Sequence, residues 1–374
     1  MLKLTLFQKL FISILSVTVA CGITTATLTY QRAKRDMFQR DNEVFLKTTI
    51  DLSREINNLL TYGRSVSQML AAHSRVKDYM SLRSGDTVQI LKVLEDHNIN
   101  KMFSAFYLVD MEGFTLLSTD ASFVGHNFGF RNYFNTAVKG GAGVDAGVGT
   151  ISRRMGYYFS YPIYSNDNSK IIGVAVAKME PQTIHANLEV SDFGFDSNKM
   201  ITNDNGVILF SEKPERVFWS LAPLTDEQMK IEQETRFINR KIEALTYEQV
   251  QAEVINYNNP TVIEFYDKGD KNEEIVATSK VGDFPFFIVI EAERDMVLKH
   301  ITDQITPIVL FVFIAIVFEM ILIGILLYIF LKPIEKIRSH TQRLAKKERA
   351  VSLELKTGDE LEDIVDSINK IANR

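Results

Sequence analysis

Cysteine is almost absent from this sequence of 374 residues: Cys21 is the only one, which excludes a disulfide framework within the chain. The six histidines do not show the spacing of metal ligands, and neither a G-x-S-x-G nor an H-E-x-x-H segment occurs. A formal net charge of -5 does not favour a nucleic-acid partner. We therefore expect no catalytic residue, no metal site, no cofactor and no nucleic-acid ligand, although a membrane-anchored hydrolase outside the cell stays an alternative.

Charged residues are nearly missing from two long apolar stretches. Leu10–Leu28 contains none and is long enough to cross a hydrocarbon core of ~30 Å as a helix. Ile305–Leu331 is apolar apart from Glu319. We expect transmembrane helices at residues 10–30 and 305–331. A cleavable signal peptide is the alternative for the first stretch, but its length and its direct passage into a helical pattern favour an uncleaved anchor.

Basic residues indicate the orientation of these helices. The segment after the second stretch is rich in them, and by the positive-inside rule it is cytoplasmic: Lys332, Lys336, Arg338, Arg343, Lys346, Lys347 and Arg349. The basic residues after the first stretch oppose this orientation, but a long translocated domain weakens their effect. We expect residues 1–9 in the cytoplasm, residues 31–304 outside the cell membrane, and a chain that crosses the membrane twice.

Glu319 lies in the middle of the second stretch, where a charge is costly unless it is protonated or faces a partner. Two interpretations stay open. Glu319 marks a signalling position at a dimer interface, or it is a tolerated, protonated residue that faces the other transmembrane helix.

Proline is absent from Tyr30–Met80, and Gly63 is the only glycine there. Apolar residues recur at close to helical spacing, which predicts a long helix at residues 31–80. Such a helix can serve as a stalk and as the seam of a dimer, and it can also pack against its own domain.

The order hairpin, helix, sheet occurs twice after this helix. Ser104–Asp110 and Gly113–Ser118 form the first predicted hairpin, and Lys199–Thr202 and Val207–Ser211 form the second. A helical stretch is expected near residues 225–254, and three strands follow at Thr261–Tyr266, Glu274–Lys280 and Phe284–Glu291. We expect two similar α+β modules in tandem, at residues 81–181 and 195–295.

The segment Phe130–Glu180 brings chemically useful side chains together. Arg131 opens a short helical pattern, and two predicted strands follow at 156–164 and 171–179. Tyr158 and Ser160 alternate onto one face of the first strand, and Lys178 lies near the end of the second. Two cations and two hydroxyls on one concave surface suit an anion with a carboxylate at each end. The glycine-rich run between helix and strands, residues 140–149, lacks the lysine of a phosphate loop and is interpreted as a flexible loop.

These motifs resemble a known family. F-R-N-Y-F-N-T-A, G-T-I-S-R-R-M-G-Y-Y-F-S-Y-P-I and I-I-G-V-A-V-A-K are similar to segments in the membrane-distal module of C4-dicarboxylate sensor kinases. The arrangement of residues 31–300 resembles a bacterial double Cache sensor domain, in which a long helix precedes two PAS-like modules. The resemblance implies a receptor in the inner membrane, with its sensor domain in the periplasm and its ligand in the first module. It implies six ligand-binding residues: Arg131, Tyr133, Thr150, Tyr158, Ser160 and Lys178.

Amino-acid-binding Cache domains provide a contrast at one of these positions. They place an aspartate where Lys178 stands, to hold the ammonium group of the ligand. A lysine repels that group, so we expect a small organic acid rather than an amino acid. An amino-acid or amine chemosensor of the same fold stays the alternative.

The last 43 residues, 332–374, resemble a HAMP domain. Pro333 begins one amphipathic helix, and Asp359-Glu360-Leu361 opens a second, for which Asp359 is the expected N-cap. In that family two chains form a parallel four-helix bundle, which implies a homodimer. We expect signalling roles for Pro333, Asp359 and Glu360, in addition to the signalling interpretation of Glu319. We expect a signal receptor without enzyme activity, which acts on a cytoplasmic partner or is a truncated form of a kinase, cyclase or chemoreceptor.

Overall fold

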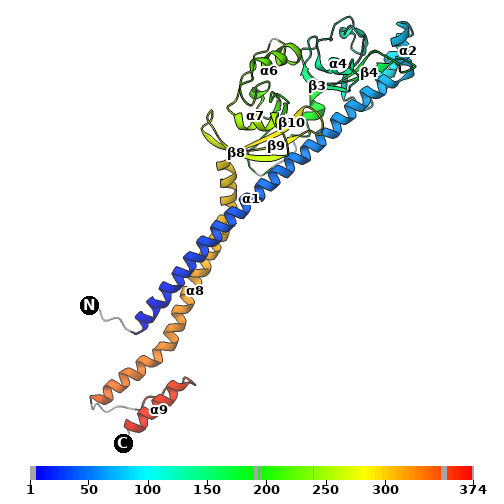
Figure 1. Ribbon diagram of the computed structural model, residues 1–374. Helices are drawn as coiled ribbons and strands as arrows, with labels where there is room; N and C mark the ends of the chain where they lie inside the picture. Colours follow the sequence, from blue (N-terminus) through cyan, green and yellow to red (C-terminus); the bar gives the residue numbers. More distant parts are fainter. Residues whose placement is uncertain (1–5, 189–192, 194, 239, 347–351, 373–374) are drawn as a thin grey trace. The chain divides into compact units, whose positions relative to one another are not determined.

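The structure is a computed structural model, and it describes residues 6–188, 193, 195–238, 240–346 and 352–372 (Figure 1). The chain forms two compact units. One consists of residues 38–300, and the other combines residues 1–37 with residues 301–374.

Helices begin the larger unit. The helix α1 (Leu6–Ala72) enters it at Phe38 and is followed by α2 (Ser74–Leu82) and α3 (Thr87–Asp96). The side chains of His73 and Asp86 accept hydrogen bonds from the first backbone N–H groups of α2 and α3, which fixes where those helices start. The expected long helix is therefore present, and it ends eight residues before the predicted Met80.

A five-stranded antiparallel sheet forms the core of the first module. Its strands are β1 (Phe103–Val109), β2 (Thr115–Ser118), β3 (Gly143–Val148), β4 (Met155–Tyr164) and β5 (Ile171–Met179), in the order β2-β1-β5-β4-β3. The short elements η1 (Ala121–Phe123), α4 (Asn132–Ala137) and α5 (Pro181–His185) connect and close it. Tyr133, Phe134 and Ala137 of α4 pack on the face that carries Tyr158 and Val176, which we call the inner face.

The glycine-rich run is not a flexible loop as the sequence suggested. Residues 143–148 form β3, which pairs with β4 from Gly143 opposite Ser160 to Val148 opposite Met155. Glycine disfavours strands on its own, but here Val144, Ala146 and Val148 alternate with small residues beside a long neighbour. Pairing along the whole edge of β4 therefore outweighs the local preference.

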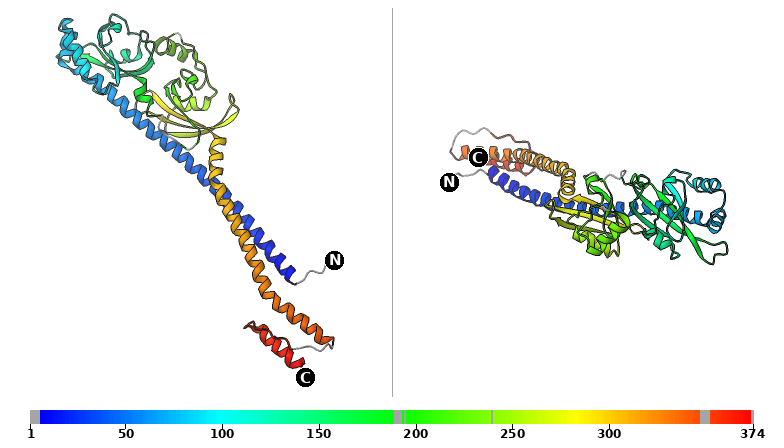
Figure 2. Two further views of the ribbon diagram at one scale, coloured as in Figure 1. Left: turned by 180° about the vertical axis from the view of Figure 1, so that it is seen from behind. Right: turned by 90° about the horizontal axis from the view of Figure 1, so that it is seen from above.

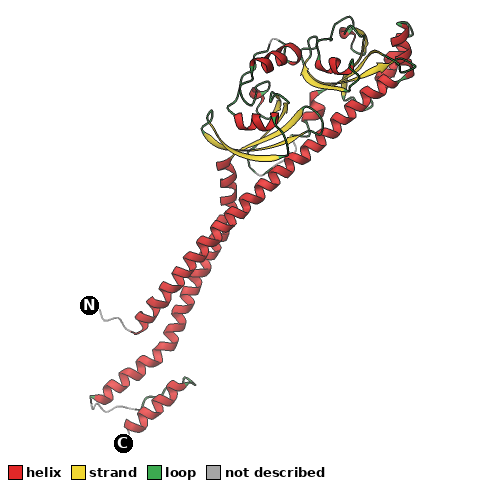
Figure 3. Ribbon diagram, in the orientation of Figure 1, coloured by secondary structure: helices red, strands yellow, loops and turns green. Residues whose placement is uncertain are grey.

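The second module repeats this topology. Its strands are β6 (Asn198–Asn203), β7 (Ile208–Ser211), β8 (Thr261–Asp267), β9 (Asn272–Lys280) and β10 (Phe286–Glu293), in the order β7-β6-β10-β9-β8. Two antiparallel sheets that lie along one long helix confirm the expected α+β fold, as the yellow strands of Figure 3 show.

The helical stretch predicted near residues 225–254 is interrupted. The structure has η2 (Pro214–Arg216), α6 (Asp226–Ile231), one π-helical turn, η3 (Glu232–Arg236), and later α7 (Glu248–Ile255). Between η3 and α7 the backbone runs beside Ser220, which donates to the Glu243 carbonyl and accepts from the Leu245 amide. This backbone pairing replaces the helical hydrogen bonds, so charged residues with high helix propensity are not helical here.

The helix α1 packs against both sheets, as two further views show (Figure 2). In the first sheet it covers the face opposite to the inner face, and in the second sheet it covers the corresponding face. The hydroxyls of Ser53 and Ser279 on β9 are 2.9 Å apart. At Gly63 a Cβ atom would lie 2.5 Å from the ring of Phe159 on β4. Glycine at this position therefore permits the helix to approach the first sheet closely.

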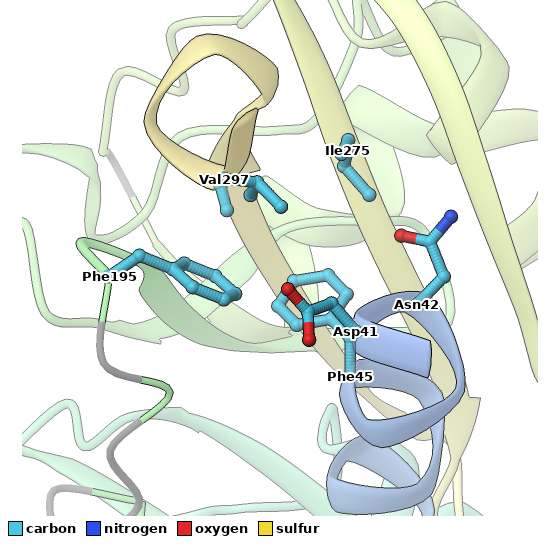
Figure 4. A pocket seen from close by; sticks show the side chains of 7 residues that line it. Asp41, Asn42, Phe45, Phe195, Ile275 and Val297 are labelled. Carbon is cyan, nitrogen blue, oxygen red and sulfur yellow. The ribbon is translucent and has the colours of Figure 1, made fainter. Parts of the chain in front are cut away.

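A small cavity lies where α1, the second sheet and the first turn of α8 (Arg294–Ala345) meet. Figure 4 shows the Asp41 carboxylate beside the ring of Phe45, with Phe195, Val297 and Ile275 around it. Asp41 Oδ2 is buried and has no hydrogen-bond partner among the described residues. Burial raises the pKa of Asp41, although the nearby charge of His300 opposes the shift.

The smaller unit contains the N-terminal part of α1, most of α8, and α9 (Glu360–Ala372). Helices α1 and α8 are long and apolar enough to cross a membrane. They pack at small residues: a Cβ at Gly22 would lie 2.9 Å from Ile316, and one at Gly324 would lie 3.3 Å from Phe11.

Pro333 does not begin a helix, because α8 runs through it without interruption. Proline lacks the N–H that would bind the carbonyl four residues earlier, and in a helix interior this costs about 3 kcal/mol. Helix α8 nevertheless continues on both sides of Pro333, so the expected start of a helix at this residue was wrong.

Candidate ligand-binding site

A small cavity lies on the inner face of the first sheet, between α4, the strand β4 and the loop that joins β3 to β4. Its volume is about 10 Å³, close to the space of one water molecule. It is lined by Tyr107, Phe123, Phe128, Arg131, Tyr133, Gly149, Thr150, Ile151, Ser152 and Tyr158.

Arg131 is the N-cap residue of α4, and its side chain is 3% exposed. Its Nη2 donates to the Val148 carbonyl and its Nη1 donates to the Thr235 carbonyl, each over 2.7 Å. The guanidinium also lies 4.9 Å from the ring centre of Phe130. Both hydrogen bonds go to neutral carbonyls, so two of the five N–H donors are used while the positive charge has no anionic partner among the described residues.

Lys178 on β5 is 2% exposed, and its Nζ donates to the Ser152 hydroxyl over 3.0 Å. The aliphatic stem lies over Gly156 of the neighbouring strand, where a Cβ would be 2.6 Å from the lysine Cε. Burial lowers the pKa of Lys178, while the charges of Glu180 and Asp120 oppose the shift. Within the described residues, no carboxylate lies within ion-pair distance of this ammonium group. A dry cation of this kind is stabilised by an incoming anion.

Three tyrosines form the wall of the cavity. The rings of Tyr133 and Tyr158 are stacked with centres 5.1 Å apart, and the hydroxyls of Tyr107 and Tyr133 are 2.8 Å apart. Burial raises the pKa of Tyr133 to about 12, even though Arg131 opposes the shift, and burial also raises the pKa values of Tyr107 and Tyr158. At neutral pH all three hydroxyls are therefore protonated hydrogen-bond donors.

The structure brings most of the predicted site residues together. Arg131, Tyr133, Thr150 and Tyr158 line the cavity, and Lys178 reaches it through Ser152. Ser160 does not: its hydroxyl donates to the Tyr133 carbonyl over 2.7 Å and holds α4 on the sheet. A buried serine under a helix satisfies a backbone acceptor in preference to a cavity.

Sequence reasoning missed Tyr107, Phe123, Phe128 and Ser152. Alternation along β1 places Tyr107 on the inner face and could have identified it. Phe123, Phe128 and Ser152 belong to irregular segments, for which the sequence provides no period that predicts which side chains face the cavity. Arg153 and Arg154 on the same loop as Ser152 are exposed to solvent.

A charged cluster joins the site to the second module. Arg236 at the end of η3 donates to Asp145 of β3 over 2.7 Å, and also to Glu232 and Asp204 of the second module. Burial opposes the charge of Arg236, but the three carboxylates together raise its pKa. Thr235, which accepts from Arg131, is the residue directly before Arg236. The same turn therefore holds both β3 and the cavity arginine.

The predicted signalling residues lie in the smaller unit. Glu319 is exposed on α8. Asp359 precedes α9, and its carboxylate accepts from the Leu361 amide, as expected of an N-cap. Glu360 is the first residue of α9 and is exposed.

Comparison with known proteins shows which families the chain resembles. A family model described as a Cache domain matches residues 33–301, and one described as a HAMP domain matches residues 325–374. The sensor domain of the V. cholerae histidine kinase DctB has the same fold, with a TM-score of 0.54 and 21% identity over 71% of this chain and 99% of that chain.

Two curated proteins are similar in sequence, both named C4-dicarboxylate transport sensor protein DctB. The protein of Rhizobium meliloti is 26% identical over 154 residues, which are 40% of this chain and 24% of the relative. That of Pseudomonas aeruginosa is 32% identical over 124 residues, 32% of this chain and 19% of the relative. The matched stretch thus spans a quarter or less of either relative. Because the Cache model covers well over half of the sequence, this chain belongs to the Cache domain family and carries a HAMP domain after its sensor.

Proposed function

We propose that the chain is a transmembrane receptor whose first module binds a small organic acid, of the carboxylate or dicarboxylate class, outside the cell membrane. Two buried cations without a carboxylate partner among the described residues support this ligand class. Arg131 can offer its remaining N–H donors to one carboxylate, and Lys178 can neutralise a second charge. Tyr133, Tyr158 and Thr150 supply hydroxyl donors from the cavity wall.

The loop between β3 and β4 acts as a lid in this proposal. A cavity of about 10 Å³ holds about one water, so a four-carbon diacid enters only when this loop moves. Ser152 on the loop accepts from Lys178, and a ligand carboxylate competes for the same ammonium group. Binding therefore replaces a contact to the lid by a contact to the ligand.

The response then passes to the second module. Arg131 donates to the carbonyl of Thr235, so a ligand that draws the guanidinium into the cavity also acts on η3 and Arg236. From there α8 leads to the HAMP segment. We propose that two chains form a homodimer there, and that the HAMP bundle acts on a cytoplasmic partner or output domain.

Thermal unfolding of the full chain in detergent tests the proposal. Succinate, malate, monocarboxylates, amino acids and amines are added singly, and a ligand at ~100 times its Kd adds about 2.7 kcal/mol of stability. Succinate or malate is expected to raise the Tm. The variants Arg131→Gln and Lys178→Gln are expected to abolish that rise.

Matched controls remove the same charges nearby. Arg153→Gln alters an exposed arginine of the loop between β3 and β4. Lys170→Gln alters an exposed lysine of the β4–β5 hairpin. Both controls should retain the rise in Tm. Stabilisation by amino acids alone would contradict the proposed ligand class and would support the amino-acid chemosensor, with Glu180 or Asp120 as candidate partners for the ammonium group.

A further inference from the structure

The two modules can be superposed residue by residue from their hydrogen bonds. Asp110 and Asn203 each accept from the backbone amides two and four residues later, which aligns β1 with β6 at an offset of 93 residues. Ala105 on β1 pairs with Lys178, and its counterpart Asn198 on β6 pairs with Glu291. Glu291 therefore occupies, in the second module, the position that Lys178 occupies in the first.

A second position also gains a negative charge in the second module. Tyr158 pairs with Lys178, and Val276 pairs with Glu291, so the residue two positions before each pair corresponds as well. That residue is Gly156 in the first module and Glu274 in the second. The glycine covered by a lysine stem is thus replaced by a carboxylate on the same face of the sheet.

A small polar cavity lies over these residues. Its volume is about 20 Å³, and it opens to solvent on one side. It is lined by Asp196, Ser197, Asn198, Lys213, Glu274, Glu291, Ala292, Glu293 and Met296.

The carboxylates in this cavity are incompletely satisfied. Oε1 of Glu291 accepts from Arg216, Lys213 and Asn198 over 2.6, 3.1 and 3.2 Å, while its buried Oε2 has no hydrogen-bond partner among the described residues. Glu274 is 4% exposed, and within the described part of the chain its side chain has neither a hydrogen bond nor an ion pair. Arg216 and Lys213 thus form ion pairs with Glu291, while Glu274 has no cation within ion-pair distance among the described residues.

We propose that this cavity of the second module is a binding site for a primary ammonium group, held between Glu274 and Oε2 of Glu291. An ammonium has three N–H donors and no acceptor, so it can satisfy both oxygen atoms at once. The residues that the structure describes contain no group of three or more His, Cys, Asp or Glu suited to a metal ion, which favours a hydrogen-bonding cation. This inference is independent of the ligand proposed for the first module.

The protonation of Glu274 agrees with such a site. Burial, followed by the charges of Glu291 and Glu293, raises the pKa of Glu274 to about 7. An incoming cation competes with that proton, so the affinity for an ammonium compound should rise between pH 6 and pH 8. The titratable and charged groups that face Glu274 from the surrounding elements are Asp196, Lys213, Tyr247, Asp267, Glu291 and Glu293.

Trp219 provides a direct readout, because it is the only tryptophan and belongs to the second module. The amide of Trp219 donates to the carbonyl of Arg216, and the side chain of Arg216 donates to Glu291. A change at Glu291 can therefore alter the environment of the indole through Arg216. The full chain in detergent at pH 8 is titrated with methylammonium and ethanolammonium chloride, with tetramethylammonium chloride as the cation that lacks N–H donors. Only the primary ammonium compounds are expected to change the fluorescence to saturation.

The variant Glu274→Gln is expected to weaken this binding about tenfold or more, since it removes one charged acceptor. The control Glu215→Gln removes an exposed carboxylate nearby and should bind normally. If the variant Glu274→Gln does not fold, the affinity of the unaltered chain for ammonium compounds at pH 6 and pH 8 still tests the proposal. Equal affinity at pH 6 and pH 8, saturation by tetramethylammonium, or the same signal with calcium chloride alone would each overturn the proposal.

Discussion

Single buried charges determine much of the chemistry of the Cache domain. Arg131 and Lys178 point positive charge at one cavity, while Glu274 and Glu291 point negative charge at the corresponding place one module later. The sequence predicted the two cations as a pair but did not single out the two carboxylates. Lys178 was predicted from its place near the end of a strand and from the family resemblance, whereas Glu274 was read only as the start of a strand.

Lys178→Met is expected to stabilise the chain in the absence of ligand while it removes the response to organic acids. The buried ammonium loses hydration that Ser152 alone does not replace, so an apolar side chain of similar length should add on the order of 1 kcal/mol. Chemical unfolding in detergent, with and without succinate, measures both effects. Lower stability of Lys178→Met would show that Lys178 has a structural anionic partner.

Asp41→Asn tests the buried carboxylate of Figure 4. The folded state raises the pKa of Asp41, so it holds this proton more tightly than the unfolded state does. The stability gained in this way is complete at low pH and is lost as pH rises through the folded pKa. At pH 7 the variant Asp41→Asn should therefore have a higher Tm than the unaltered chain. The expected gain in the free energy of unfolding is about 1 kcal/mol, for one unsatisfied buried atom. This gain should become smaller as the pH falls toward 4. The control Asp51→Asn alters an exposed aspartate of the same helix.

Among the elements, the turn η3 and the strand β3 connect the two modules. The sequence predicted the remaining strands within about two residues, because alternation of apolar residues on a half-buried sheet is a strong local signal. The prediction was wrong at β3, where the high glycine content indicated a loop instead of a strand. It was also wrong after η3, where backbone pairing with Ser220 replaces the expected helix. Thr235 and Arg236 lie in that second segment. The junction between the modules could not be foreseen, because it depends on contacts across about 90 residues.

Arg236→Ala is expected to destabilise the chain by about 3–5 kcal/mol, since it leaves the buried carboxylates of Asp145 and Glu232 without a counter-charge. The double variant Arg236→Met with Asp145→Asn removes both partners and should recover part of that loss. The free energy of unfolding of each variant measures the difference. Additive effects of the two changes would mean that this pair does not join the modules.

Gly63→Ala tests the contact between α1 and β4. The added methyl group would lie 2.5 Å from the Phe159 ring, so either the helix or the strand must shift, at a cost of about 1–3 kcal/mol. Ser65→Ala, at an exposed position of the same helix, should leave the Tm unchanged. The Tm of both variants measures the effect. An unchanged Tm for Gly63→Ala would show that the packing of α1 does not require the close contact between Gly63 and Phe159.

At the scale of the whole molecule, a Cache domain is followed by a HAMP domain, and the proposed homodimer would pair two such chains. Glu319 is exposed on α8, on a surface that is otherwise strongly apolar. A mid-membrane carboxylate is costly unless it finds a partner, and a second copy of the same helix can provide one through a shared proton.

Cross-linking tests this pairing. In a Cys21→Ser background, Glu319→Cys is expected to form a covalent dimer on mild oxidation in membranes. Phe318→Cys and Ile321→Cys, on neighbouring exposed positions, give the comparison. Equal cross-linking at all three positions would indicate random collision rather than a defined interface.

The hydrogen bond from Arg131 to the Thr235 carbonyl has a thermodynamic consequence for sensitivity. Coupling between two sites is reciprocal: if the ligand changes the second module, then anything that holds the second module in one state changes the ligand's affinity by the same factor. A partner bound at the cytoplasmic end would thereby set the concentration at which the receptor responds. The threshold for an external compound would then be adjusted from inside the cell, without any change in the residues that touch it.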